Sequence, residues 1–185
     1  MVKIKSPATG VALAIILVAP AACGKNGGQA QRPPVNLLID APRGAGVWRH
    51  TSWWEQDKGN SASRRWLRGV SDFTEIADAF GSVDAAKDHF RNLAPEKISP
   101  DVYRGVKNDD IGATMDGADE VEFKCGETNG SACMTWWTWA RYGKYTVQFT
   151  YRHDPADATA LTDTELAMIV SNAGREVAKK ARGNS

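Results

Sequence analysis

The sequence contains few of the side chains from which catalytic and metal-binding motifs are usually built. Only three histidines occur among its 185 residues. These are His50, His89 and His153, and their spacing matches no His-Glu-x-x-His or other local ligand pattern. The sequence also lacks a Gly-x-Ser-x-Gly elbow, a Ser-x-x-Lys pair and a phosphate-binding loop. We therefore expect no metal ion, no cofactor and no catalytic site of a kind defined by a local motif.

A charge excess is missing as well. The chain has 23 basic and 22 acidic side chains, which gives a formal net charge of +1. If an N-terminal leader of residues 1–22 is removed, Lys3 and Lys5 are removed with it, and the remaining chain has 21 basic and 22 acidic side chains. Nucleic-acid-binding domains carry a clear basic surplus. We therefore expect no nucleic acid partner.

No hydrophobic run is long enough to cross a membrane. The longest, Val11–Val18, falls far short of the roughly 20 apolar residues that a transmembrane helix needs. It follows Lys3 and Lys5 and precedes a series of small residues, which is the layout of a secretion signal. We interpret residues 1–22 as a signal peptide and expect the remaining chain to be exported.

The residues after this run resemble the lipobox of bacterial lipoproteins, in which small residues precede a lipid-accepting cysteine. Ala21, Ala22 and Cys23 match that pattern, whereas Pro20 stands where the family usually has Leu, Val or Ile. The resemblance implies lipidation of Cys23 and anchoring to the outer face of the cell membrane. Ala19–Ala21 also fits ordinary signal cleavage at an A-x-A site, which would release a soluble secreted protein instead.

The odd number of cysteines supports the lipoprotein interpretation. An exported chain with three cysteines has one left over if the other two pair. We expect Cys125 and Cys133 to form a disulfide, which persists outside the cytoplasm, and Cys23 to carry the lipid. Residues 23–36 contain almost no apolar side chains and are interpreted as a flexible tether. Residues 37–185 then form a single extracytoplasmic domain.

The most regular part of this domain is Val121–Arg152, which is rich in β-branched and aromatic residues and predicts paired strands. A hairpin turn is expected at Gly143, and the length of its loop decides the register. A two-residue loop places Trp137 and Trp139 with Gln148 on the more polar face, where they form a candidate binding face. A three-residue loop, or cover by another element, makes both indoles part of the core.

The remaining elements complete an α+β fold, a twisted antiparallel sheet with helices packed on it. Strands are expected in three further places, at residues 48–55, 64–70 and 102–107. Asp72 and Glu75 have the spacing of a capping box, so a short helix is expected through Phe80. A second helix is expected between Ser82 and Pro95, because apolar residues recur there at helical spacing.

The last element is a long amphipathic helix near the C-terminus. Thr162 and Glu165 have the spacing of a capping box at its start. An apolar stripe follows, formed by Leu166, Ile169, Val170, Ala173 and Val177. Gly174 costs about 1 kcal/mol relative to alanine in a helix interior. We therefore expect this glycine to permit a close approach of the helix to the sheet.

The exported N-terminus, the cysteine pair before a Trp-rich strand, the Arg141–Tyr145 hairpin and the C-terminal helix together resemble small secreted lipoproteins of actinobacteria. The same layout is similar in outline to the extracellular sensor domains of bacterial receptor kinases. The likeness covers Ala118–Ala181 and includes no diagnostic motif. It implies an α+β, cell-surface, non-catalytic module, and it assigns no residue of this chain to a functional site.

Two functions are compatible with these observations. The first is a membrane-anchored, non-enzymatic module that binds a small ligand, an envelope polymer or another envelope protein. The second is a small envelope hydrolase, because a carboxylate pair can carry out acid–base catalysis without a local motif. The carboxylates considered for that role are Asp109, Asp116, Asp119 and Glu122.

Overall fold

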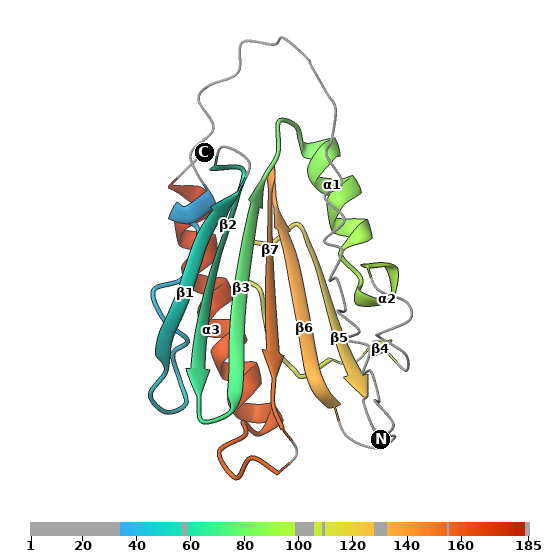
Figure 1. Cartoon of the computed structure of the whole chain (residues 1–185). Coiled ribbons are helices and arrows are strands. Elements are labelled where there is room, and N and C mark those ends of the chain that lie inside the picture. Colours follow the sequence, from blue (N-terminus) through green and yellow to red (C-terminus); the bar gives the residue numbers. More distant parts are fainter. Residues whose placement is uncertain are drawn as a thin grey trace, which may run out of the picture.

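The computed structural model describes residues 34–56, 59–98, 106–108, 110–127, 133–154 and 156–183. Their main feature is an antiparallel sheet with the strand order β1-β2-β3-β7-β6-β5-β4 (Figure 1). The strands are β1 (Arg49–Gln56), β2 (Ser61–Arg68), β3 (Ser71–Ala79), β4 (Lys107–Asn108), β5 (Glu120–Glu127), β6 (Cys133–Tyr142) and β7 (Tyr145–Arg152). The helices are the short 3-10 helix η1 (Pro34–Asn36), α1 (Val83–Asn92), α2 (Pro95–Ile98) and α3 (Asp163–Arg182). The expected α+β class is confirmed.

Different helices cover the two faces of the sheet. α3 crosses one face, which we call the α3 face (Figure 1), whereas α1 and α2 cover part of the opposite α1 face. On the α3 face, Phe73, Phe149 and Tyr151 are almost fully buried against Leu166 and Val170 of the helix. The space between these side chains is too small for a water molecule. This layer is therefore a packed core and not a ligand cavity.

β6 and β7 form the hairpin expected at Gly143. Tyr142 pairs with Tyr145, so the loop between the strands has two residues. Gly143 has a φ of +59°, a conformation that glycine adopts without steric cost and that two-residue hairpin loops require. Of the two registers considered, this is the one that places Trp139 opposite Gln148 on the α1 face.

The expected helix from Asp72 to Phe80 is wrong. The segment forms β3, at the centre of the sheet between β2 and β7. Its residues alternate between the two faces, and Glu75 takes a fully buried position on the α3 face. A buried glutamate is rare, and it concealed the two-residue period of a strand. Asp72 caps no helix, because its carboxylate accepts hydrogen bonds from Arg152 at 2.8 Å and Arg65 at 3.2 Å.

The other helix predictions and both early strands are confirmed. Ser82 caps α1 by accepting a hydrogen bond from the backbone N–H of Ala85 at 3.1 Å. At the start of α3, the Thr162 hydroxyl accepts from the Glu165 N–H at 3.2 Å, and the Glu165 carboxylate accepts from the Thr162 N–H at 2.9 Å. The apolar stripe of α3 is buried along its length. β1 and β2 form within one to three residues of their expected positions.

Gly174 lets α3 approach another part of the chain closely, but the neighbour differs from the one expected. A Cβ atom on Gly174 would lie 2.8 Å from Sδ of Met115 and 3.0 Å from the carbonyl oxygen of Thr114. The close contact is therefore with the loop before β5 and not with the sheet. The Ser171 hydroxyl fixes the same loop by accepting a hydrogen bond from the Thr114 N–H at 2.9 Å.

Several predictions fall outside the described residues. They concern the signal peptide at 1–22, the lipidated Cys23, most of the tether and most of the expected strand at 102–107. Lys107, the last residue of that expected strand, opens β4. Within the part of the chain that the structure describes, no helix is long and apolar enough to cross a membrane.

Candidate functional site

Trp137 and Trp139 lie on the α1 face, but they do not form an open surface. Their exposed fractions are only 4% and 0%. Phe90 of α1 lies over Trp139 with ring centroids 6.4 Å apart, and Leu93 belongs to the same small buried cluster. The apolar side of α1 thus covers both indoles. The candidate binding face formed with Gln148, which is half-buried, is corrected to a second core.

A glycine in β5 explains how Trp137 fits under this cover. A Cβ atom on Gly126 would lie 2.6 Å from carbon atoms of the Trp137 ring, closer than a side chain allows. Glycine within a strand often marks such a close approach. The absence of a side chain at Gly126 therefore leaves the space that the Trp137 ring occupies beside β5.

The carboxylates considered for a hydrolase are not enclosed in a shared site. Asp109 lies outside the described residues, and Asp116 and Glu122 are exposed. Asp119 is engaged in the fold, because its carboxylate accepts a hydrogen bond from Nη1 of Arg141 at 2.8 Å. Acid–base catalysis by carboxyl groups depends on a shielded environment that tunes their pKa values, and these three are open to solvent. Among the described residues, no three His, Cys, Asp or Glu side chains gather to hold a metal ion.

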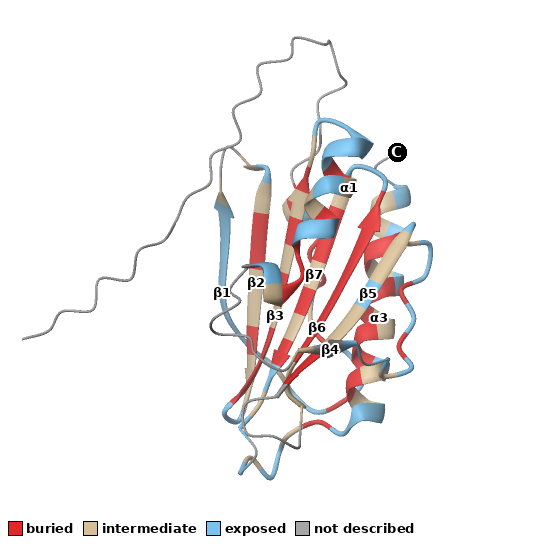
Figure 2. Cartoon of the chain, turned by 90° about the vertical axis from the view of Figure 1, so that its right-hand side faces the viewer, coloured by how far each residue is buried: buried red, intermediate tan, exposed pale blue. Residues whose placement is uncertain are grey.

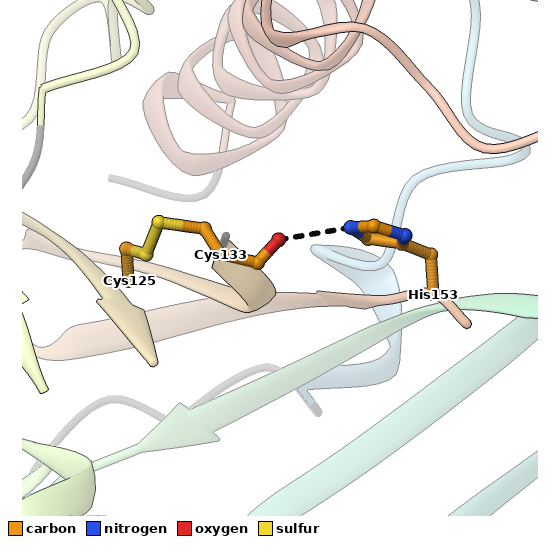
Figure 3. The surroundings of a disulfide bond; sticks show 3 residues. All are labelled: Cys125, Cys133 and His153. Carbon is orange, nitrogen blue, oxygen red and sulfur yellow. Dashed lines mark hydrogen bonds between the residues drawn. A yellow bond between two sulfur atoms is a disulfide. The ribbon is translucent and has the colours of Figure 1, made fainter. Parts of the chain in front are cut away.

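Cys125 and Cys133 pair as expected at neighbouring ends of β5 and β6, with Cα atoms 5.5 Å apart (Figure 3). His153, at the end of β7, lies beside this pair. Its Nε2 is 2.9 Å from the carbonyl oxygen of Cys133, and its ring stacks on Tyr151 with centroids 5.6 Å apart. The cluster joins three neighbouring strands at one end of the sheet, which indicates a structural role.

Glu75 is a fully buried carboxyl group on the α3 face. Its Oε2 accepts a hydrogen bond from the Ile39 N–H at 2.8 Å, whereas Oε1 has no hydrogen-bond partner. Burial raises the pKa of Glu75 from 4.5 to about 8, and the Ile39 hydrogen bond and the charges of Lys180 and Arg64 offset part of that effect. The side chain is therefore a neutral carboxylic acid at neutral pH.

The segment Leu37–Asp40, which follows η1, encloses Glu75. Arg64 and Lys180 donate hydrogen bonds to backbone carbonyls of this segment at 2.7 and 2.6 Å. Glu176 accepts a hydrogen bond from the last N–H of the segment at 2.9 Å. Because three charged side chains hold the cover in place, Glu75 is closed off from substrates, and its effect is on stability.

β1 is an exposed edge of the sheet (Figure 2). Seven of its eight residues are exposed, and the last is half-buried. They include Trp53 and Trp54, with exposed fractions of 51% and 41%. Within the described residues, β1 pairs with β2 on one side and with no strand on the other. Large exposed aromatic side chains along an unpaired strand are typical of an interaction surface.

Trp53 and Trp54 were not predicted as a site, and their adjacency alone is no signal of exposure, because Trp136 and Trp137 are also adjacent and both are buried. Neighbouring residues of a strand point to opposite faces, so two adjacent tryptophans cannot both enter the same core. Trp53 lies opposite Arg64 on the α3 face, and Trp54 lies opposite Ser63 on the α1 face. At an edge strand, neither face offers enough neighbours to bury an indole.

The fold is thus an α+β domain with a filled core, and its exposed β1 edge is the candidate functional surface. Comparison of the chain with models of protein families, with curated proteins and with solved structures finds no significant match.

Proposed function

We propose that this chain is a non-enzymatic interaction module of the cell envelope that binds a partner protein through the outer edge of β1. The observation that carries the proposal is the exposure of Trp53 and Trp54 along an unpaired strand. Such an edge offers backbone N–H and C=O groups that a further strand can bind. The two indoles add a large apolar contact on each face of the joined sheet.

β1 has few of the devices that protect sheet edges in other proteins. Natural edge strands are often very short or carry lysine or proline. β1 has eight residues and contains neither residue type. Its pairing with β2 is interrupted by a bulge between His50 and Ser52 and is regular from Ser52 to Gln56. At the opposite edge of the sheet, β4 has two residues within the part of the chain that the structure describes. β1 is therefore the edge better suited to strand addition.

We place this module outside the cytoplasm, anchored by a lipid on Cys23. The proposal is supported by the apolar run Val11–Val18, by the small residues before Cys23 and by the pairing of Cys125 with Cys133. Mass spectrometry of the mature N-terminus tests the anchor. A lipid-modified Cys23 at the first position is expected. An unmodified chain that begins at Ala22 would contradict the anchor and indicate a soluble secreted protein.

Site-specific photo-crosslinking tests the contact surface. A photo-reactive amino acid is introduced into the full chain at Trp53 or at Trp54, in the cells that produce it. Val70 provides a matched control, because it is apolar, 70% exposed and located in the turn between β2 and β3. Defined protein adducts are expected from both β1 positions and not from Val70. Unmodified protein at both β1 positions, or the same adducts from Val70, would refute the proposed contact surface.

A further inference from the structure

We propose that the partner of β1 is a second copy of this chain, so that two sheets join edge to edge through antiparallel β1 strands. This inference rests on the proposed function, which makes the β1 edge the contact surface. The joint is two-fold symmetric, and every contact across it occurs twice. β1 must then be complementary to its own reversed copy, and its side chains meet this requirement.

The pairing with β2 shows which β1 side chains share a face. His50 and Trp53 lie on the α3 face, opposite β2 residues that are two positions apart. Arg49 and Trp54 lie on the α1 face. In a regular strand, residues an odd number of positions apart point to opposite faces. His50 and Trp53 nevertheless share a face, as do Arg49 and Trp54, because the bulge at Thr51 adds one residue to the strand.

A reversed copy of β1, centred on the bulge, brings these pairs together across the joint. Trp54 of one copy then lies beside Arg49 of the second copy on the α1 face, which is a cation–π arrangement. Trp53 lies beside His50 of the second copy on the α3 face. His50 already makes an edge contact of this kind with Trp66, at a centroid distance of 6.1 Å. Both exposed indoles thus obtain a partner from the same strand sequence.

The charges of β1 favour the same orientation. Arg49 stands at the start of the strand and Glu55 near its end, and the strand has no other Lys, Arg, Asp or Glu. Arg49 lies on the α1 face, whereas Glu55, opposite Ala62, lies on the α3 face. Antiparallel copies therefore bring no like charges together, whereas parallel copies in register would place like charges side by side on the same face. The strand has no charge excess that would select a strongly acidic or basic partner. A reversed copy of β1 therefore meets no charge repulsion.

The size of the joint suits an anchored protein. Two eight-residue edges bury less surface than a standard protein interface, so we expect weak association in dilute solution. A lipid on Cys23 would confine both copies to one membrane and raise their effective concentration. The full chain in membranes is therefore the state in which pairing is measured.

The test uses membranes that hold isotopically light and heavy copies of the full chain, with the photo-reactive amino acid at Trp54. The expected product is a two-copy adduct in which residue 54 of one isotopic form is joined to the tryptic peptide 44–49 of the other. The Trp54–Arg49 contact is tested in chains that keep Trp54, as energy transfer between labelled copies in the membrane. In these chains Arg49→Ala should lower the association constant about five- to thirty-fold, because two symmetric cation–π contacts are lost. Arg43→Ala is the matched control, since Arg43 is exposed and lies outside β1.

The outcomes separate this inference from the proposed function. Adducts from position 54 that contain only other proteins would overturn self-pairing and leave the β1 contact surface in place. No adduct of any kind from position 53 or from position 54 would overturn both proposals. Equal association constants for Arg49→Ala and Arg43→Ala, in chains that keep Trp54, would overturn the Trp54–Arg49 register.

Discussion

Replacing Glu75 with glutamine should stabilise the domain at alkaline pH and change its stability little near pH 5. In the folded chain, burial keeps Glu75 protonated up to about pH 8, whereas its reference pKa is 4.5. Glutamine has nearly the same shape, and its amide oxygen can accept the hydrogen bond that the Ile39 N–H donates to Glu75. It carries no proton that unfolding would release.

The sign and size of the effect follow from proton binding. Between pH 4.5 and 8, the folded chain holds a proton on Glu75 that the unfolded chain releases, so the free energy of unfolding falls as pH rises. The two pKa values differ by 3.5, from 4.5 to about 8. At about 1.36 kcal/mol for each pKa unit, this amounts to roughly 5 kcal/mol. The contribution is complete below pH 4.5 and is lost as pH rises through about 8.

Urea unfolding of the parent and of Glu75→Gln, with the disulfide intact, measures this difference from about pH 5 to pH 9. The free energy of unfolding of the variant minus that of the parent should rise with pH and level off above about pH 8. Glu122→Gln removes an exposed carboxylate from the same sheet and controls for the change in net charge. Parallel curves for the parent and Glu75→Gln would refute the burial argument.

Three further substitutions test the packing. Trp139→Ala should cost about 3–5 kcal/mol of unfolding free energy in urea, because the indole is fully buried; a loss below about 1 kcal/mol would mean that α1 does not cover it. Serine at both Cys125 and Cys133 should cost about 2.5 kcal/mol, and free alkylation of both thiols in the exported parent protein would contradict the pairing. Gly174→Ala should lower the melting temperature by forcing a Cβ against Met115, and a higher melting temperature would contradict that contact.

The hairpin and α3 were predictable because their signals are local. The two-residue register at Gly143 was one of two arrangements that follow from strand alternation and turn chemistry. The capping residues of α3 lie at the start of the helix, and the Thr162–Glu165 capping box forms as predicted. Elements of this kind depend little on distant parts of the chain.

β3 and the role of the tryptophans were not predictable in the same way, because distant segments decide them. Glu75 is tolerated in a central strand only because the Leu37–Asp40 segment covers it and supplies a hydrogen bond. Trp139 is core because α1 folds over it, whereas Trp53 is exposed because β1 is an edge strand. The local sequence does not show where a strand lies in the sheet. That location decides whether an indole on the strand is buried or exposed.

Hydrogen exchange at the β1 backbone tests the central claim most directly, because it reports whether the exposed edge is paired. The comparison is between the full chain in its membrane and the same chain diluted to monomers in detergent. We predict that outward-facing amides of Ser52–Gln56 exchange more slowly in the membrane, while amides of β3 exchange at the same rate in both states. Equally fast exchange of Ser52–Gln56 in both states would show that the edge is free, and the claim that β1 is the contact surface would then be wrong.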